Sequence, residues 1–461
     1  MDAAPETDSR SERIQRGPLK SAVFLLALPV LCEQGLSFCV GFFDTWLSGR
    51  FSSEATTAIG VVAYVGWLVS MLYGLVAVGT TALVSRNIGA GDRTTANAVM
   101  NRSIGLAILL GWALAASVWW IADTLSGLLG MTGTTAELVA RYLRRDAIGL
   151  AFYGVGLTGA AALRGSGDMR TPLLVLGFVS VVNMLGSCLL VFGWGPIPPG
   201  GVDGIIWGTV IARAFGGGLM LAVLVRGRGC LRLGRACLRL VDPVVRRILR
   251  IGGPAAVDGF IMWSGHFLFL RIIAQLGRGD AQSRIFAAHV IGIEVEAITY
   301  LPAVAWGAAA ATMIGQCLGA GNPERAQEAG RTAARQCSLL ALFLTIVFLL
   351  GADSIYRFMH ADSTVHEVGI PAFRMLACFQ IPLVICIVYT AALRGAGDSR
   401  TPMILTCISV LGIRVPLAWY FGVFLSGGLS GAWIGMCADV TFRAVMVRWR
   451  FQRGNWARIE V

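Results

Sequence analysis

Two acidic residues, Glu33 and Asp44, lie inside the first long apolar stretch of the sequence, at residues 21–47. Ionisable side chains inside a membrane are costly, and they commonly mark the paths of ions or protons. In a helix the spacing would place both acids within about 20° of one face, about 16 Å apart along the axis. Pro29 precedes Glu33 by one turn and removes a backbone hydrogen bond, so we expect a bend there. We therefore predict that these acids bind a proton or cation reversibly.

Asp44 stands near the C-terminal end of this predicted helix, where the helix macrodipole disfavours negative charge. Such a position suits a carboxyl group that takes up and releases a cation. An aspartate close to the end of a span can also be an interfacial residue that only contacts water at the headgroups. Position alone leaves both interpretations open.

Other candidates lie in later stretches. The secondary acidic candidates are Asp258 and Glu296. Aromatic rings attract organic cations, so four aromatic residues are candidates for a cavity lining: Tyr64, Trp67, Trp263 and Trp306. The other interpretation is that they pack between helices or form an interfacial belt.

Isolated histidines and two arginines inside spans have simpler interpretations. His266 and His289 have no neighbour at metal-ligand spacing, so we predict hydrogen bonds between helices and no metal site. We predict that Arg213, in the stretch 204–225, and Arg443, in the stretch 428–447, are snorkelling anchors.

The composition indicates an all-α polytopic membrane protein. Of the 461 residues, 56% are hydrophobic and 14% are charged, whereas soluble domains have about 25% charged residues. The apolar residues form blocks of about 20, the length that crosses about 30 Å of hydrocarbon. We predict twelve transmembrane helices, near 21–47, 57–84, 103–121, 146–163, 171–193, 204–225, 251–275, 286–315, 337–351, 371–393, 402–424 and 428–447.

The net charge of +12 comes from arginines gathered in short connections and in the C-terminal tail. The positive-inside rule explains this distribution, and it argues against a nucleic-acid partner. We therefore expect a multi-pass protein of the plasma (inner) membrane with both termini in the cytoplasm. The exceptions are Arg141, Arg144 and Arg145, which this topology places outside.

The sequence is duplicated. "AALRGSGDMRTP" at 161–172 recurs as "AALRGAGDSRTP" at 391–402, and "IGAGDRTTA" at 88–96 recurs as "LGAGNPERA" at 318–326. "ALPVLCEQG" at 27–35 recurs as "GGPAAVDGF" at 252–260, so Glu33 corresponds to Asp258. Six spans thus repeat in order, a pattern typical of transporters whose halves enclose a central site. We predict a cytoplasmic tail (1–20), an N-lobe (21–225), an Arg-rich linker (226–250), a C-lobe (251–447) and a C-tail (448–461).

The repeated dodecamer is predicted to be a structural turn in each lobe. Its glycines, Gly165 and Gly395 among them, allow a tight turn, and Asp168 and Asp398 can cap the helix that follows. Arg164 and Arg394 can hold the last carbonyls of the preceding helix or pair with the aspartate. A nucleotide or phosphate site would need GxxxxGK[ST] or a related loop, which is absent.

These repeated loops, with "AAHVIGIEVEAITYLPAVAWGAAAATMIGQCLGAG" (287–321) and "FFDTWLSGR" (42–50), resemble the MATE family of multidrug and toxic compound extrusion transporters. The resemblance covers about residues 20 to 450. It implies two homologous six-helix lobes around a central cavity. It also implies export of organic, often cationic, compounds against inward proton or sodium flow, with no enzymatic activity and no cofactor other than the coupling ion.

The resemblance is nearer to the proton-coupled, DinF-like branch than to the sodium-coupled, NorM-like branch. The DinF-like proton site implies Asp44 as the coupling residue, Pro29 as the upstream bend, and Asn183 and Tyr142 as polar neighbours. Where that branch has a second aspartate, this sequence has Ser187, and Glu33 could be a substitute. The NorM-like acids of the seventh and tenth spans fall on apolar positions, around Met262 or Trp263 and near Leu383.

Two alternatives remain open. A flippase for lipid-linked precursors would be expected to line its cavity with basic residues that bind pyrophosphate, and Arg213, Arg271, Arg374 and Arg414 are the few inside spans. The other alternative is an intramembrane enzyme or a scaffold. An enzyme would need motifs such as HExxH or GxSxG, which are absent, and a scaffold would not need buried acids or a duplicated cavity-forming lobe. The expected partners are small organic molecules and membrane lipid, and the resemblance implies a protein that works as a monomer.

Overall fold

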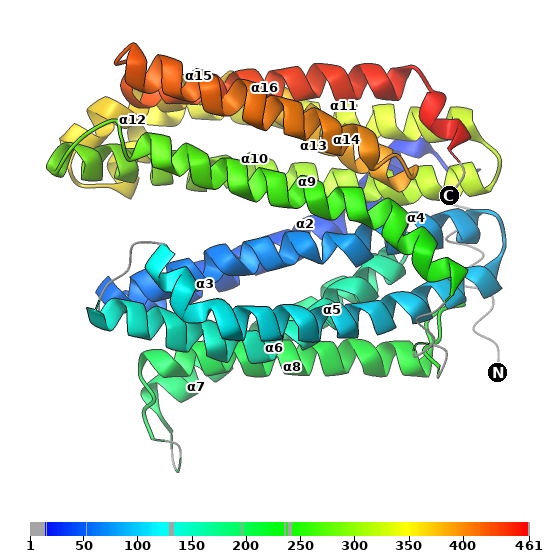
Figure 1. Cartoon of the computed structure of the whole chain (residues 1–461). Helices are drawn as coiled ribbons and strands as arrows, with labels where there is room; N and C mark the ends of the chain where they lie inside the picture. Colours follow the sequence, from blue (N-terminus) through cyan, green and yellow to red (C-terminus); the bar gives the residue numbers. More distant parts are fainter. Residues whose placement is uncertain are drawn as a thin grey trace. The chain divides into compact units, whose positions relative to one another are not determined.

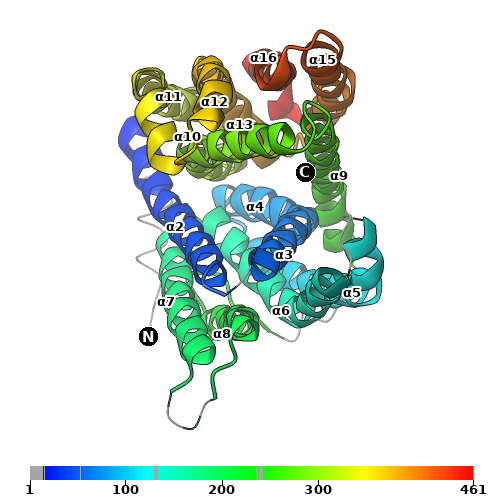
Figure 2. The same ribbon diagram turned by 90° about the vertical axis from the view of Figure 1, so that its left-hand side faces the viewer.

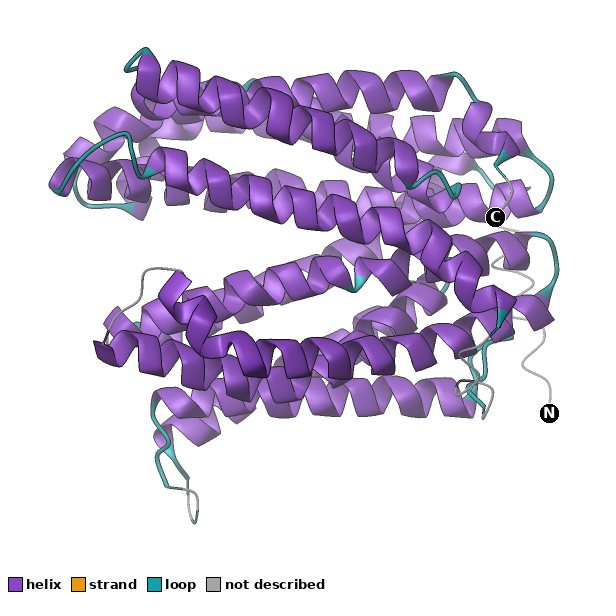
Figure 3. Cartoon of the chain, in the orientation of Figure 1, coloured by secondary structure: helices purple, strands orange, loops and turns teal. Residues whose placement is uncertain are grey.

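The computed structural model describes residues 14, 16–51, 53–128, 133–194, 196, 198–234, 237 and 242–459. The regular structure of these residues is helical, with short connecting loops and an isolated bridge between Arg228 and Leu231 (Figure 3). The predicted all-α fold class is confirmed.

Helices occupy all twelve predicted positions. They are α2 (Leu19–Ser48), α3 (Ser53–Leu72) with α4 (Gly74–Gly89), α5 (Arg93–Leu128), α6 (Gly133–Gly165), α7 (Arg170–Phe192), α8 (Val202–Arg226), α9 (Pro243–Ile273), α10 (Asp280–Gly319), α11 (Pro323–Met359), α12 (Ser363–Ala377) with α13 (Gln380–Gly395), α14 (Arg400–Ser409) to η3 (Tyr420–Phe424), and α16 (Gly428–Gln452).

Within the described residues, ten helices are long and apolar enough to cross a membrane, and eleven if α12 and α13, bent by 54°, form one span. The remaining predicted span is α16, which carries Asp439 and three arginines. These charges make it too polar for recognition by hydropathy, although Asp439 and Arg443 are buried.

The chain divides into two compact units, Met1–Gln15 with Cys32–Ala256 and Arg16–Leu31 with Val257–Val461. We call them the N-terminal and C-terminal units. The division passes through α2 and α9, whereas the predicted lobe boundaries lie in connections. The lobes at 21–225 and 251–447 stay a prediction.

In the N-terminal unit, α6 packs against α3, α4, α5 and α8, and α7 packs against α8 (Figures 1 and 2). Its core includes Tyr73, whose hydroxyl donates to the carbonyl of Leu150 at 2.7 Å. Small residues allow close contact between these helices. For example, a Cβ on Gly154 would lie 2.1 Å from the ring of Tyr73.

In the C-terminal unit, α10 packs against α11, α12 and α13, and α16 packs against α12, α13 and α14. The core includes Trp433, whose indole Nε1 donates to His289 Nδ1 at 3.1 Å. This bond joins α16 to α10, so the predicted interhelical role of His289 is confirmed. The span 400–424 contains two π-helical turns, η2 (Val410–Arg414) and η3, and such turns often occur at functional sites.

Two equivalent loops show how the repeat begins its third helix. Asp92 accepts hydrogen bonds from the backbone N–H and hydroxyl of Thr95 at the start of α5, and Asn322 accepts from the N–H of Arg325 at the start of α11. Hydrogen bonds from Thr95 and Thr94 lower the pKa of Asp92 to about 2. N-capping therefore explains why "GAGD" and "GAGN" recur.

The three arginines that disagree with the positive-inside rule all face carboxylates. Arg144 pairs with Asp123, Arg145 lies 2.6 Å from Asp203, and Arg141 lies 3.7 Å from the same carboxylate. In the second repeat Arg374 pairs with Asp353 in the same way. These ion pairs explain how the arginines are accommodated, but the positive-inside rule counts arginines and not net charge, so the three residues still disagree with the predicted topology.

Candidate ion-coupling site

Asp44 lines a cavity of about 360 Å³ inside the N-terminal unit. Five helices enclose the cavity, namely α2, α3, α6, α7 and α8. Its polar lining includes Asn183 from α7, Thr209 and Arg213 from α8, and Asp146 from α6. The structure thus brings Asp44 and Asn183 together, as the resemblance implied.

Thr209 connects the two predicted residues. Its hydroxyl accepts from Asn183 Nδ2 at 3.3 Å and can donate its one proton to Asp44 Oδ2 at 3.5 Å or to the carbonyl of Ile205 at 3.2 Å. Asp44 Oδ1 and Asn183 Oδ1 are buried without a hydrogen-bond partner among the described residues. Buried acceptors of this kind are costly unless something donates to them. The cluster therefore offers two oxygen atoms to a hydrogen-bond donor or a cation.

Arg213 contributes a fixed positive charge to this cavity. Its Nη1 donates to Asp146 Oδ1 at 2.6 Å, and its guanidinium lies 5.3 Å from the centre of the Tyr153 ring. The prediction that Arg213 is a snorkelling anchor is wrong, because its guanidinium binds a buried carboxylate instead of reaching the interface. The cavity therefore contains two acids and one base.

Glu33 does not line the cavity of Asp44. It lies in an adjoining cavity of about 330 Å³ and accepts from Arg164 Nη1 at 2.9 and 3.1 Å. Both side chains are largely buried. Glu33 as a substitute second acid stays a prediction, and the structure adds that an arginine already neutralises it.

The same ion pair occurs in the second repeat. Asp258 accepts from Arg394 Nη2, and the Asp258 side chain is 7% exposed. The first helix of each repeat is thus tied to the hairpin after its fourth span. Sequence analysis had expected Arg164 and Arg394 to act within their own hairpins, and it did not identify these partners.

The remaining residues of the repeated loop act as predicted. Asp168 accepts from the N–H and hydroxyl of Thr171, and Asp398 accepts from those of Thr401, so both aspartates cap the following helix. Each aspartate also forms an ion pair with an arginine near the end of its repeat. Asp168 lies 3.1 Å from Arg228, just after α8, and Asp398 lies 2.9 Å from Arg450, in the last turn of α16.

Of the two glycines in each copy that were predicted to allow the turn, the second one makes it. Gly167 and Gly397 have φ of 89° and 96°, values that favour glycine. Gly165 and Gly395 instead allow close packing, since a Cβ on Gly395 would lie 2.5 Å from the backbone of Ala311.

Buried charge also occurs in the C-terminal unit. Asp439 accepts from Arg414 Nε at 2.8 Å and from Arg443 at 2.8 and 2.9 Å, so the predicted snorkelling of Arg443 is wrong as well. Glu296 is near Arg414. These residues lie on α10, α16 and the π-helical turn η2.

The aromatic candidates occupy different surroundings. Trp306 is 5% exposed, donates to Gln336 Oε1 at 3.0 Å, and packs on the Phe24 ring, so it lies in a helix interface. Tyr64 packs beside Trp67, and Trp263 stacks on Phe267. Their predicted role in a cavity lining stays a prediction.

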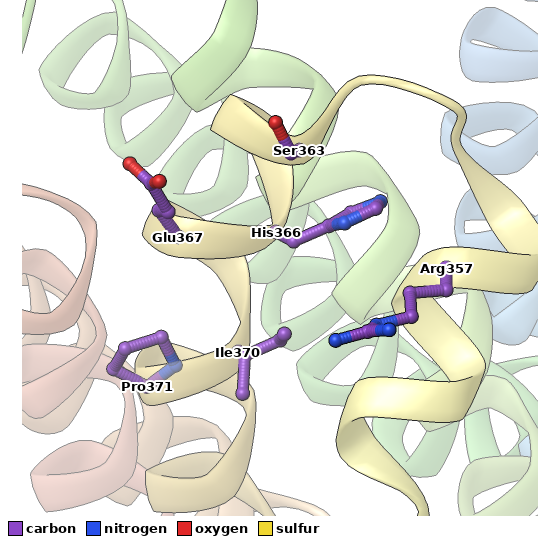
Figure 4. A pocket seen from close by; sticks show the side chains of 6 residues that line it. All are labelled: Arg357, Ser363, His366, Glu367, Ile370 and Pro371. Carbon is purple, nitrogen blue, oxygen red and sulfur yellow. The ribbon is translucent and has the colours of Figure 1, made fainter.

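A separate open pocket of about 590 Å³ lies at the end of α11 and the first half of α12. Figure 4 shows Arg357 and His366 projecting toward it, with Glu367 and Ser363 on α12. His366 Nε2 lies 2.8 Å from the carbonyl of His360. None of the predicted site residues lines this pocket.

The match to a known protein family agrees with the duplicated architecture. The sequence model of the MatE family matches residues 29–189 and 254–420, one stretch in each half of the chain. The chain belongs to the MATE family of transporters.

Relatives and solved structures of MATE proteins agree over nearly the whole length. A probable multidrug resistance protein NorM of Thermotoga maritima is 30% identical over 445 residues, covering 95% of this chain and 94% of the relative. The multidrug resistance protein PmpM of Pseudomonas aeruginosa is 26% identical, covering 96% and 93%. The outward-facing structure of a multidrug resistance MATE family transporter superposes with a TM-score of 0.89 at 21% identity, covering 98% and 100%. These similarities place the chain among transporters, not enzymes.

The resemblance to the DinF-like branch implied a second acid at the position of Ser187. Its side chain is fully buried, and a Cβ on Gly208 of α8 would lie 2.3 Å from Ser187 Oγ. Helices α7 and α8 are therefore too close here for a larger side chain. In this MATE protein the second acid of the cavity is Asp146, which comes from α6.

Tyr142 was expected to neighbour Asp44, but it is not among the residues that line the Asp44 cavity. It is fully buried, and its hydroxyl has no hydrogen-bond partner among the described residues. The guanidinium of Arg141 lies 5.9 Å from its ring. Its proposed part in coupling has no direct contact with Asp44 to support it.

Sequence analysis missed Asp146 and Thr209. Thr209 and Arg213 are one turn apart in an apolar span, so they form a polar stripe that helical periodicity could have revealed. Asp146 stands at the first residue of a predicted span, where an acid is easily taken for an interfacial residue.

Proposed function

We propose that this MATE protein exports organic, often cationic, compounds in exchange for inward protons by alternating access, with Asp44 as the residue that carries the proton. The observation that carries the proposal is the charge balance of the Asp44 cavity. Asp146 and Arg213 neutralise each other, which leaves Asp44 as the unbalanced group. A buried charge without a partner is costly. Proton binding at Asp44 makes the cavity neutral, and proton release makes it negative.

Such a change suits an antiporter. The coupling residue must favour one conformation when it is protonated and another when it is ionised. The Thr209 hydroxyl can donate to ionised Asp44 Oδ2 at 3.5 Å or to the carbonyl of Ile205 at 3.2 Å. Protonation of Asp44 reverses the first of these hydrogen bonds, because the carboxylic acid then donates to Thr209 Oγ1 and the Thr209 proton stays on Ile205. The proton would therefore change the connection between α2 and α8, and Pro29 inside α2 offers a bend through which the helix can respond.

Sodium coupling is the second candidate for the ion, and the geometry offers one observation in its favour. Asp44 Oδ1 and Asn183 Oδ1 are unpartnered oxygens of the kind that hard cations bind. The positive guanidinium of Arg213 in the same cavity disfavours binding of a metal cation, whereas a proton on Asp44 adds no separate ion to the site. The DinF-like assignment stays a prediction, since several relatives bear the name NorM.

Export of lipid-linked precursors is less well supported. A pyrophosphate would need free guanidinium groups. Arg213, Arg414 and Arg374, three of the intramembrane arginines first considered, are paired with Asp146, Asp439 and Asp353. The names of relatives support drugs as the substrate class, since one relative is a multidrug resistance protein, although another is an FAD transporter.

The proposed location is the inner membrane with both termini in the cytoplasm, and the proposed working form is a monomer. The arginine-rich connection 226–250 supports the orientation. Cysteine labelling of Ser426→Cys in intact cells tests it, because this loop residue would be outside. A cysteine at Gly91→Cys, in the loop between α4 and α5, would react only after permeabilisation, because this loop would be in the cytoplasm.

Transport in proteoliposomes tests the function. Ethidium movement under an imposed pH gradient should be fast for wild type and collapse in Asp44→Asn, while a sodium gradient alone should drive little movement. Asp123→Asn, which removes an exposed carboxylate of the same unit, is the control. Transport that persists in Asp44→Asn would move the coupling site elsewhere, and Asp258 and Glu296 would be tested next. Failure of every cationic dye under both gradients would refute the multidrug proposal.

A further inference from the structure

The cavities that contain Asp44 and Glu33 adjoin each other inside the N-terminal unit. Five residues line both of them, namely Ser37, Tyr153, Leu176, Val179 and Arg213. The volumes are about 360 and 330 Å³, and a water molecule occupies about 30 Å³ in the liquid. The two cavities together can therefore hold a chain of water molecules that passes Arg213.

One face of α2 follows the two cavities. Glu33, Ser37 and Asp44 are spaced by four and seven residues, which keeps them on the same side of a helix. Ser37 carries a hydroxyl and lines both cavities. Asp44 and Glu33 are about 16 Å apart along the helix axis at 1.5 Å per residue. A proton therefore needs intermediate carriers between them, and Ser37 and water can provide these.

The surroundings of Glu33 contain few other charges. Arg164 from α6 binds it directly, Tyr153 from α6 and Arg213 from α8 line the same cavity, and α3 contributes Ser70. The lining residues of α7 are apolar, namely Pro172, Val175, Leu176 and Val179. Glu33 is thus the carboxylate of this cavity, at the end of α6 that leads into the repeated hairpin.

We propose that Glu33 is a proton relay between Asp44 and the aqueous phase at the hairpin end of the N-terminal unit. This inference rests on the proposed proton coupling at Asp44. The O–H bond at Asp44 breaks, the proton passes along water and Ser37, and an O–H bond forms at Glu33 while its ion pair with Arg164 loosens. Glu33 then releases the proton to bulk water and pairs with Arg164 again. No other reactant is consumed, and both carboxyl groups end ionised.

Stopped-flow detection of released protons tests the relay. Purified protein in nanodiscs is mixed with ethidium in weakly buffered pyranine solution, so that displacement of the Asp44 proton is seen as a change in dye absorbance. The amplitude reports the proton on Asp44, and the rate reports its path. Wild type should release protons, and Asp44→Asn should lose the amplitude. If wild type releases none, the proposed function fails before the relay is at issue.

Glu33→Gln should keep the amplitude and release the proton about a hundredfold more slowly or worse, a typical loss for a missing acid–base group. Added sodium azide, a small diffusible proton carrier, should restore the rate. The double variant Glu33→Gln/Arg164→Gln leaves no unpaired charge, so it guards against misfolding, and it should be equally slow. Asp258→Asn removes the equivalent ion pair of the second repeat and is the matched control.

Three results would overturn the relay. The first is an unchanged release rate in Glu33→Gln or in the double variant. The second is equal slowing in Asp258→Asn, which would show that loss of an ion pair and not loss of an acid causes the effect. The third is a slow rate that azide does not restore, since a purely structural defect would not respond to a proton carrier.

Discussion

Removal of Arg213 should destabilise the N-terminal unit more than removal of any exposed arginine. Arg213 lies 2.6 Å from Asp146, and the exposed fractions of the two side chains are 22% and 7%. Two unit charges about 4 Å apart interact by about 4 kcal/mol at an effective dielectric constant of about 20. Arg213→Gln leaves a buried carboxylate without its partner, and such a change typically costs about 3–5 kcal/mol. We expect a loss of that size.

The double variant Asp146→Asn/Arg213→Gln separates the ion pair from the packing. It leaves no unpaired charge, and replacing a buried pair by neutral groups is often close to neutral. We therefore expect it to be more stable than either single variant, with a coupling free energy of about 3 kcal/mol in a double-mutant cycle. It also keeps Asp44 as the unbalanced acid of the cavity, so proton-driven ethidium transport should survive better than in Asp146→Asn alone.

Equilibrium unfolding in mixed micelles, followed by tryptophan fluorescence, measures these free energies. Arg144→Gln is the control, because Arg144 forms its ion pair with Asp123 in the same unit and both side chains are well exposed. Exposed pairs contribute about 0–1 kcal/mol. If Arg213→Gln costs no more than Arg144→Gln, or if the effects of the two cavity mutations simply add, the argument from a buried and mutually neutralising pair is refuted.

Three further predictions concern packing, hydrogen bonding and pH. Gly208→Ala should destabilise by about 1–3 kcal/mol, the usual cost of overpacking, because the new methyl group would lie 2.3 Å from Ser187 Oγ; Gly218→Ala on the same helix meets nothing within 4 Å and should have little effect on thermal unfolding in detergent. Tyr73→Phe removes a buried hydrogen bond to Leu150 and should cost about 1 kcal/mol, and an unfolding midpoint equal to that of wild type would contradict this. The pKa of Asp92, about 2 against an ordinary 3.8, means that its stabilising effect is present above about pH 4 and is lost as the pH falls toward 2; carboxyl NMR should give a midpoint near 2, and a midpoint near 4 would show that the cap is absent in solution.

Most of the fold could be predicted because apolar length and turn residues are local properties. The blocks of about 20 apolar residues indicate membrane helices without any knowledge of their neighbours. Local reasoning also identified the caps at Asp168 and Asp398, since a cap needs only the next turn of the chain. The bend between α12 and α13 could not be predicted, because Pro371 lies inside α12 and not at the break.

The site was less predictable because its contacts are long-range. Glu33 and Arg164 are 131 residues apart, and Arg213 and Asp146 are 67 apart. No spacing rule connects such residues. Arg213 lies in the middle of the predicted span 204–225, so the anchor interpretation had no support from its position, and only the packing of α6 against α8 shows that a buried acid faces it. Asp44 and Asn183 were identified because a resemblance to a family supplied the missing spatial information.

Comparison of the two repeats shows what is particular to the N-terminal unit. Both repeats have the acid that binds the hairpin arginine, Glu33 in one and Asp258 in the other. Eleven residues after Glu33 stands Asp44, whereas eleven residues after Asp258 stands Phe269, which is buried in the core of the C-terminal unit. Duplication therefore accounts for the ion pair in both units but not for Asp44. An acid that is absent from the equivalent position of the second repeat is not needed to build the fold. This asymmetry supports assigning the coupling proton to Asp44, and it is the reason to expect that Asp44→Asn leaves folding intact while it abolishes proton-driven transport.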